Sequence, residues 1–432
     1  MIVAAPLPKY LSSLWEATSP PMPALPVLRD HLRADVTIVG GGHAGLTTAI
    51  HLAEHGCDVV ILEAAPAIGL GASGLSGGQV NPGIKYDPDE IEAVYGPKRS
   101  PYLLEFAGGA AKASFDLITR LSIDCDAIQR GFVQPALERR SLAILERRCD
   151  QWQRRGAPVQ LLDAHAMAAL IGTDRYIGGW VDGRGGTVHP LKYTRGLLVA
   201  ALARGVRVFV ASRAQSFDRR GGHWQTLTTE GSVTSDSLAI LTNAYSDGVC
   251  PGLSRSYVPV RSFQLATRPL PEAIAQTVMA GGYGASDMRR LLLYWRRDPD
   301  NRLLIGGRSS FNVPRSTQNF DPLERMLRHL YPQIGNVEIE HRWYGYVAMT
   351  TDSVPHFYNL GKNALALVGC NGRGVALFSA LGEPIARWLQ SGQDDVLPLP
   401  IVDRIKTVPF HRFHTLGAAA LTTYFRMRDW ID

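Results

Sequence analysis

The stretch Ala34–Glu63, ADVTIVGGGHAGLTTAIHLAEHGCDVVILE, decides the fold class of this chain. Residues 34–39 are a short apolar run rich in β-branched side chains, which favours a buried parallel strand. Apolar residues then recur at helical spacing as far as Gly56, and residues 59–62 form a second buried strand. Strand, glycine turn, helix and strand in this order predict a dinucleotide-binding βαβ unit.

The glycine turn of this unit satisfies the pattern G-x-G-x-x-G at Gly40, Gly42 and Gly45. The first glycine permits the tight turn, the second lets the backbone approach a pyrophosphate, and the third packs helix against strand. The N–H groups at the helix start offer the diphosphate a place to sit. Glu63 is placed to accept hydrogen bonds from both ribose hydroxyls and would repel a 2′-phosphate, so NADP is disfavoured.

A ligand-wrapping loop is expected at residues 69–79, GLGASGLSGGQ, which are too rich in small residues for an ordinary helix or strand. Here the chain resembles the D-amino-acid-oxidase-like family of FAD-dependent oxidoreductases, most closely its gamma-glutamylputrescine oxidase branch. Members commonly carry G-A-S-x-x-x-G-G-Q along the flavin. The other matching stretches are YLSSLWEATSPPMPALP from Tyr10, GGTVHPLKYTRGLLVAALARGVRVF from Gly185, TNAY from Thr242, RRLLLYWRRDPDNRLLIGGR from Arg289, WYGYVAMTTDSVPHF from Trp343, GCNGRGVALFSALGEPIA from Gly369, and TVPFHRF and YFRMRD in the tail.

The resemblance implies an α/β fold with a Rossmann-like FAD-binding domain and a second, mixed-sheet α+β substrate domain. The length of 432 residues suits two domains better than one compact core. Residues 1–33 are expected to form a proline-rich arm. The FAD-binding domain is then expected at 34–98, 155–260 and 340–395, the substrate domain at 99–154 and 261–339, and a C-terminal arm and helix at 396–432.

Two further units can be predicted from the residues themselves. Pro190 opens a helix that leads into a strand at 206–210, as in a doubly wound sheet. Residues 364–368 form an apolar strand, and the second glycine turn, residues 369–374, connects it to a helix that begins near Val375. In the family this turn presents N–H groups to the flavin pyrimidine, where negative charge develops on reduction. A plain strand–helix connection is the alternative.

FAD is expected to be bound non-covalently. Gly345 stands where sarcosine oxidases carry a cysteine tether, and Leu75 stands near the histidine tether of related dehydrogenases. The expected FAD contacts are Gly40, Gly42, His43, Ala44, Gly45, Glu63, Ala64, Gly71, Ala72, Ser73, Gly77, Gly78, Gln79, Ala214, Asn243, Ala244, Gly372, Gly374 and Val375.

The chemistry implied by the resemblance is hydride transfer from the carbon that bears an amine to flavin N5, giving an imine that water hydrolyses. Such enzymes often lack an obligatory acid–base residue, because their main task is to position a neutral amine. Tyr294 and Trp295 alternate on one expected strand, so one should face the ligand and the other the core. Trp343 and Tyr346 precede the segment that leads back to the flavin, and core packing is an equal alternative for each aromatic.

Charged residues near the expected pocket bear on the substrate. Arg373 either stabilises the reduced flavin anion or serves a helix start. Val347 replaces the arginine with which D-amino-acid and glycine oxidases clamp a substrate carboxylate, so a simple α-amino acid is disfavoured unless Arg261, Arg268 or Arg296 substitutes. The expected catalytic contacts are Tyr294, Trp343, Tyr346 and Arg373.

Composition argues against several other classes. No apolar run reaches the roughly eighteen residues of a membrane helix, and no signal peptide is evident, so a cytoplasmic protein without a membrane span is expected. The five cysteines are widely spaced, which predicts reduced thiols and no metal site, and His411 and His414 have no third ligand nearby. Despite the net charge of +6, residues 138–155 mix arginines with acids, which indicates a solvated helix face and no nucleic-acid partner.

The sequence therefore predicts an FAD-dependent amine oxidase. Its substrate is a small-molecule amine, either a polyamine derivative or an unusual amino acid, and oxygen is the expected electron acceptor. One alternative is an amino- or imino-acid dehydrogenase that passes electrons to a quinone or carrier protein. A second is a flavin- or NAD-binding regulatory protein without turnover.

Overall fold

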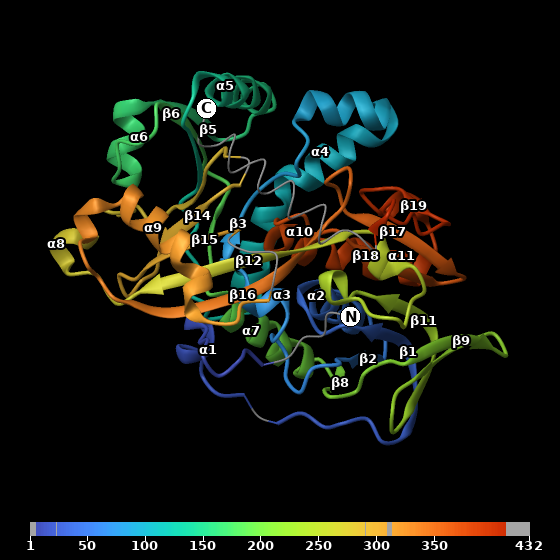
Figure 1. The fold of residues 1–432 in the computed structure, drawn as a ribbon. Coiled ribbons are helices and arrows are strands. Elements are labelled where there is room, and N and C mark those ends of the chain that lie inside the picture. The colour runs from blue at the N-terminus through green and yellow to red at the C-terminus, as the bar shows by residue number, and fades with distance from the viewer. Residues whose placement is uncertain (1–5, 23, 290, 309–312, 412–432) are drawn as a thin grey trace.

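Two large sheets organise the molecule (Figure 1). The computed structural model describes residues 6–22, 24–289, 291–308 and 313–411. The first sheet has a parallel centre, and the hairpin β9 (Ser216–Arg220) and β10 (His223–Leu227) extends from it. Its remaining strands, in spatial order, are β19 (Ile401–Val402), β17 (His356–Gly361), β18 (Ala364–Val368), β11 (Ser232–Ile240), β1 (His31–Val39), β2 (Val59–Leu62) and β8 (Arg207–Phe209).

The predicted βαβ unit is at the centre of this sheet. β1 and β2 pair in parallel, with Val36 opposite Val59, and α2 (His43–Glu54) connects them. The chain reverses after α2 at Gly56, whose φ of +82° favours glycine. In the same way α7 (Pro190–Leu202) leads into β8. The predicted α/β fold class is confirmed.

Both faces of the first sheet are buried, which explains why its strands are continuously apolar. In β18, Leu365 and Leu367 pack with the helices, whereas Ala364 and Ala366 belong to the core of the opposite face. That opposite face is covered by the hairpin β9–β10 and neighbouring loops, where a doubly wound sheet would carry helices. The helices on the first face are α2, α4 (Pro88–Arg120), α7, α10 (Gly374–Ala380) and α11 (Gly382–Ser391).

The second sheet is mixed, as predicted, and mostly antiparallel. Between β13 and β4 the pairing is parallel. A small third sheet consists of β3 (Gln79–Val80) and β7 (Gly186–Thr187). Each of these strands occurs where the chain passes from one large sheet to the other. In spatial order the second sheet contains β16 (Ile339–Met349), β12 (Val258–Thr267), β15 (Leu303–Gly307), β14 (Tyr294–Arg297), β13 (Gly284–Ser286), β4 (Phe132–Ala136), β6 (Gly178–Asp182) and β5 (Val159–Asp163).

Sheet membership differs from the predicted segments in several places. The strands β5 and β6 fall in the segment 155–260, which was predicted to belong to the FAD-binding domain, but they pair in the second sheet. The same holds for β16, nearly all of which falls in the predicted segment 340–395. Conversely, α4, which was divided at residue 98, packs with the core of the first sheet. These strands have similar apolar patterns, so local sequence does not reveal which sheet they join.

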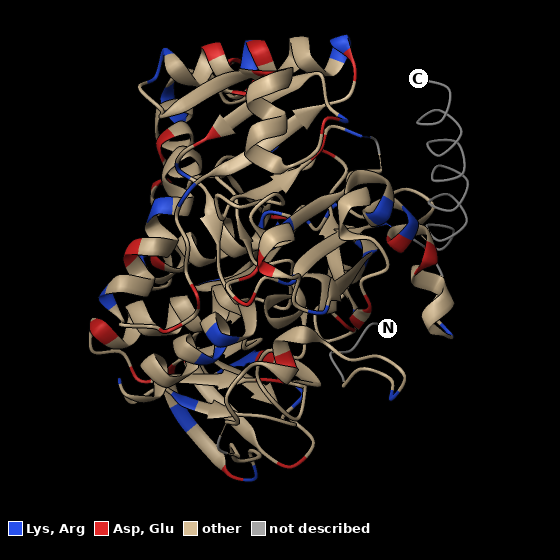
Figure 2. Cartoon of the chain, turned by 90° about the vertical axis from the view of Figure 1, so that its left-hand side faces the viewer, with Lys and Arg blue, Asp and Glu red and all other residues tan. Residues whose placement is uncertain are grey.

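The remaining helices cover the second sheet or connect the two parts. Arginines in and just after α5 pair with acids at the start of α4, including Arg148 with the N-cap residue Asp87 at 2.6 Å and Arg155 with Glu92 at 2.5 Å. Figure 2 shows basic and acidic residues mixed along the ribbon. These remaining helices are α1 (Leu14–Ala17), α3 (Ala72–Leu75), α5 (Arg139–Gln153), α6 (Ala164–Ile171), α8 (Glu272–Ala275) and α9 (Asp321–Leu330).

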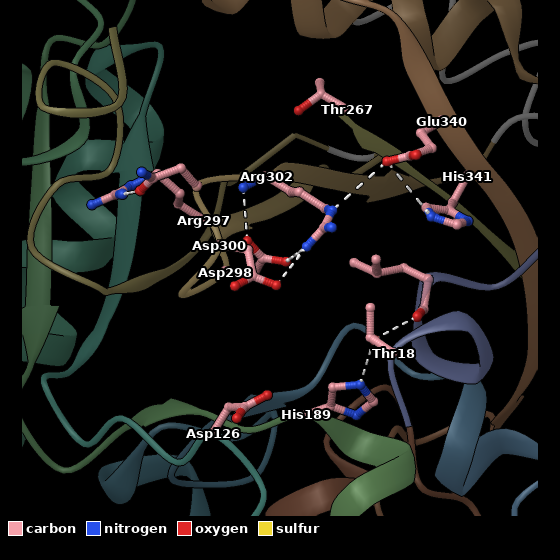
Figure 3. Close-up of polar contacts among 12 residues, drawn as sticks. Thr18, Asp126, His189, Thr267, Arg297, Asp298, Asp300, Arg302, Glu340 and His341 are labelled. Atoms are coloured by element: carbon pink, nitrogen blue, oxygen red, sulfur yellow. Dashed lines mark hydrogen bonds and ion pairs between the residues drawn. The ribbon is translucent and has the colours of Figure 1, made fainter. Parts of the chain in front are cut away.

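The N-terminal arm is extended apart from α1 and is docked on α7. Thr18 Oγ1 lies 2.9 Å from His189 Nε2, and His189 in turn caps α7 by accepting from Lys192 N (Figure 3). Glu16 forms an ion pair with Arg195 at 2.9 Å. The arm is thus fastened to the helix that precedes β8.

At the other end, the predicted C-terminal helix and His414 lie outside the described residues. His411 Nε2 contacts the carbonyl oxygen of Tyr257 at 3.0 Å. No helix in the described part of the chain is long and apolar enough to cross a membrane.

Candidate functional site

A cavity of about 730 Å³ lies between the carboxyl ends of β1 and β2 and one face of the second sheet. Its volume is in the range of small-molecule and cofactor sites, about 300–1,000 Å³. Ligands bind at the carboxyl ends of parallel strands because the connecting turns leave a crevice there. The cavity therefore joins the predicted dinucleotide site to the second sheet.

At the end of β2, the partly buried carboxylate of Glu63 faces this cavity. Its Oε2 accepts from Gly41 N at 2.9 Å and its Oε1 accepts from Ala65 N at 2.8 Å. Burial raises the pKa of Glu63, while these backbone hydrogen bonds oppose the rise. A carboxylate has about four acceptor sites, so the two oxygens retain capacity for the hydroxyls of a ribose.

The glycine turn has the close approaches that its pattern predicts. A Cβ on Gly42 would lie 2.9 Å from Ser73 Oγ, and a Cβ on Gly45 would lie 2.0 Å from the carbonyl oxygen of Gly40. The N-cap residue of α2, Gly42, has no side chain to cap the helix, and His43 N donates to Ser73 Oγ at 3.0 Å. A helix start that opens on a cavity, with a glycine as its N-cap residue, suits a diphosphate.

Most of the predicted FAD contacts share this cavity. Gly45 and Ala244 do not line it: Gly45 packs α2 against β1, and Ala244 is buried in a hydrophobic core. His43 contributes its backbone, because its ring is buried against α7 with Nε2 3.0 Å from Thr194 Oγ1. The predicted contacts that line the cavity are Gly40, Gly42, His43, Ala44, Glu63, Ala64, Gly71, Ala72, Ser73, Gly77, Gly78, Gln79, Ala214, Asn243, Gly372, Gly374 and Val375.

The stretch predicted as a loop at 69–79 contains one helical turn, α3, and three side chains hold its end. Trp15 Nε1 donates to Ser76 O at 2.9 Å. Leu75 O accepts from Trp343 Nε1 at 3.1 Å and from Gln264 Nε2 at 2.6 Å. Short polar contacts of this kind fix a glycine-rich segment that has little packing of its own.

Trp343 was predicted as a catalytic contact, and the structure corrects that interpretation. Its side chain is fully buried and is not part of the cavity wall. An aromatic residue on a strand can face either side, and here the indole turns to Leu75 and Trp15. Trp343 is therefore a positioning residue for the α3 segment.

Tyr294 lines the cavity, and Trp295 turns to the opposite face, where it stacks on Tyr176. The Tyr294 ring crosses Gly306, where a Cβ would lie 2.0 Å from the ring, and its hydroxyl lies 2.7 Å from Ser262 Oγ. Burial raises the pKa of Tyr294, so the phenol stays protonated. The alternation predicted for this strand gives one cavity residue and one core residue.

Tyr346 also lines the cavity and contacts one of the arginines proposed for carboxylate binding. Arg261 Nε donates to Tyr346 Oη at 2.9 Å, and the guanidinium lies 5.0 Å from the ring centroid. The other two arginines do not reach the cavity wall: Arg268 is exposed and pairs with Glu338, and buried Arg296 donates to the carbonyl oxygen of Val188.

Arg373 lies in the second glycine turn, at the N-cap of α10, and lines the cavity. Its guanidinium donates to the carbonyl oxygen of Pro82 at 2.5 Å. Burial, with a smaller contribution from Arg148, lowers the pKa of Arg373 to about 10, so it remains a cation at neutral pH. The side chain is directed to Pro82 and the backbone caps the helix, which fits the helix-start alternative.

Several polar residues of the cavity wall, including four in or near strands of the second sheet, were given no role by the sequence. Gln264 is one, and Arg308, directly after β15, is another. Asp287 and Arg289 form an ion pair at 3.3 Å, and burial raises the pKa of Asp287 to about 6. The quoted stretch from Arg289 contains two of the four, but nothing in its pattern distinguishes these arginines from its others.

Comparison with known proteins agrees with this geometry. Residues 35–388 match the family described as "FAD dependent oxidoreductase" (DAO). The chain is 34% identical to gamma-glutamylputrescine oxidoreductase of Escherichia coli (strain K12), over 98% of this chain and 99% of that protein. Among solved structures, glycine oxidase from Geobacillus kaustophilus superposes with a TM-score of 0.70 at 21% identity, covering 83% of this chain and 95% of that one. L-proline dehydrogenase from P. horikoshii gives 0.67 at 16% identity, covering 85% and 95%.

Proposed function

We propose, from the premise that this chain belongs to the FAD dependent oxidoreductase (DAO) family, that it oxidises the C–N bond of an amine. The observation that carries the proposal is the single cavity that Glu63 and the glycine turn share with Tyr294 and Tyr346. A cofactor and a small substrate could meet in such a space without crossing bulk water.

The residues around the glycine turn would hold FAD. Glu63 would accept from the ribose hydroxyls, the start of α2 would face the diphosphate, and the α3 segment would lie along the cofactor. Of the second glycine turn, Gly372, Gly374 and Val375 line the same cavity. When bound, FAD supplies an acceptor for the hydride of the carbon that bears the amine, and the resulting imine is hydrolysed in water.

The protein residues near Tyr294 would orient a neutral amine. The Tyr294 phenol and Ser262 hydroxyl form one polar pair, and the Arg261–Tyr346 pair forms another. No proton needs to be taken by these groups if the amine enters in its neutral form, and neutral hydroxyls in a buried wall can accept or donate one hydrogen bond to it.

The proposed substrate is based on the relative from Escherichia coli, which is named gamma-glutamylputrescine oxidoreductase. A gamma-glutamylated or otherwise N-acylated polyamine is the first candidate substrate of this chain, and an unusual amino acid is the second. Val347, at the position expected for a carboxylate clamp, is apolar and lines the cavity, which disfavours a simple α-amino acid.

Oxygen is the proposed electron acceptor. A dehydrogenase that reduces a quinone or carrier protein is the second candidate, since the same fold is found in L-proline dehydrogenase. The cytoplasmic location expected from the sequence stays a prediction.

The test is a steady-state panel with purified protein. Putrescine, gamma-glutamylputrescine, N-acetylputrescine and D- and L-amino acids would be offered in air with a peroxide assay, and in parallel with a redox dye under nitrogen. Peroxide release with one amine class supports the oxidase. Dye reduction without peroxide supports the dehydrogenase, and no response to any amine contradicts the proposal.

A further inference from the structure

Arg308 is the one cation of the cavity wall that takes no part in the hydrogen bonds and ion pairs of the described residues. Its side chain is half-buried. Burial lowers the pKa of Arg308, and no charged neighbour contributes to that shift. The desolvation of a guanidinium is unfavourable unless an anion or several acceptors surround it, so this position is suited to an anionic ligand group.

Arg308 directly follows β15 and lines the cavity, in agreement with the side that strand alternation gives it. Successive residues of a strand face opposite sides of the sheet. Gly306 lies under the Tyr294 ring on the cavity side, whereas a Cβ on Gly307 would contact Leu293 and Leu323 of the core. Arg308 is the next residue with the orientation of Gly306, about two residues, or roughly 7 Å, along the strand direction.

The lining of this cavity contains more Lys and Arg than Asp and Glu residues. Arg289 lines the cavity and forms an ion pair with Asp287. Arg261 also lines the cavity, where it donates to Tyr346. The same cavity is also lined by Met288 and Leu292, which would accommodate an alkyl chain. Arg308 thus has no ion pair with a carboxylate among the described residues.

We propose that Arg308 binds a carboxylate carried by the substrate at the end remote from the reacting carbon. The inference rests on the amine-oxidising function proposed above and narrows its substrate class to amines that carry a distal carboxylate. An arginine recognises a carboxylate through two parallel N–H donors, which a lysine cannot reproduce. Because Val347 removes the expected clamp, recognition shifts from the α-carboxylate of an amino acid to an anionic group further along the chain.

The first test measures anion binding without turnover. Glutarate, a carboxylate that contains no amine, would be titrated into the purified holoenzyme by calorimetry, with the neutral glutaramide as comparison. Wild type should bind glutarate, and Arg308→Met should weaken binding at least about tenfold, as expected for loss of a charge-assisted pair. Arg268→Met, an exposed arginine on the same sheet that pairs with Glu338, is the matched control and should not change it.

The second test measures discrimination during turnover. The kcat/KM of gamma-glutamylputrescine would be divided by that of N-butyrylputrescine, which lacks the carboxylate. Arg308→Met should lower this ratio at least about tenfold, Arg308→Lys should restore part of it, and Arg268→Met should preserve it.

The outcomes separate the inference from the function on which it rests. Amine turnover with an unchanged ratio in Arg308→Met, or no glutarate binding to wild type, overturns the inference and leaves amine oxidation standing. Arg308-dependent glutarate binding without oxidation of any amine would support the anion site and contradict the proposed function.

Discussion

Trp15 of the N-terminal arm lies edge-on against Trp343 of the second sheet, with ring centroids 5.6 Å apart. The two indoles donate to neighbouring carbonyl oxygens, those of Ser76 and Leu75. Since these carbonyls end the α3 segment, a residue from the arm and a residue from the sheet fix the same edge of the cavity. The arm is thereby part of the framework of the proposed cofactor site.

Trp15→Phe should weaken FAD retention because it leaves the carbonyl of Ser76 without its donor. A suitable control is Trp224→Phe, since Trp224 is also buried and donates to a backbone carbonyl, that of Lys362, in the hairpin of the first sheet. Both changes should cost about 1–2 kcal/mol of stability. Only Trp15→Phe should raise the FAD dissociation constant, measured by flavin fluorescence; an equal rise in both variants would argue against a specific role.

Glu63→Lys should sharply reduce the flavin content of purified protein. The change replaces a partly buried acceptor by a cation next to Gly41 N and Ala65 N, which currently donate to the carboxylate. Glu63→Gln keeps the shape and one acceptor oxygen, so it should have an intermediate effect. The ratio of flavin to protein absorbance after desalting measures this, and full occupancy in Glu63→Lys would refute the ribose assignment.

Gly306→Ala should lower amine turnover at least about tenfold while FAD stays bound. A Cβ here would lie 2.0 Å from the Tyr294 ring, so the ring must move, and small displacements in an active site cost large factors in rate. Gly109→Ala is the control, because nothing lies within 4 Å of its Cβ and alanine is the better helix former. Equal kcat/KM values for the two variants would contradict the proposal that Tyr294 contacts the substrate.

Stability should fall as pH decreases from about 6.5 toward 3. Burial lowers the pKa of His43 and of His189 to about 3, so the unfolded chain binds more protons than the folded chain in that window. Each histidine then disfavours folding by about 2 kcal/mol at pH 5. His189→Asn, which can still cap α7, should show a smaller loss of thermal midpoint between pH 7 and 5. A loss as large as in wild type would contradict this account.

Local features of the fold could be predicted from the sequence. Residues 364–368 form β18 as predicted, and Gly56 ends the turn of the first βαβ unit, because strand burial and glycine turns depend on neighbours in the chain. The βαβ unit predicted a dinucleotide site, and the chemical class followed from the family resemblance carried by the motifs after it.

Features that depend on distant contacts could not be predicted. Trp15 contacts the backbone of Ser76, and the proposed role of Arg308 depends on the cavity that distant segments form around it. Trp343 was misinterpreted for the same reason, since either face of its strand is apolar enough for a tryptophan.

Anaerobic addition of gamma-glutamylputrescine to the purified protein tests the central claim most directly. We expect a yellow protein whose visible flavin band bleaches on mixing and returns when an electron acceptor is admitted. A colourless protein would contradict the proposed cofactor site. A flavin that stays yellow with this amine and with the rest of the amine panel would contradict the proposed oxidation.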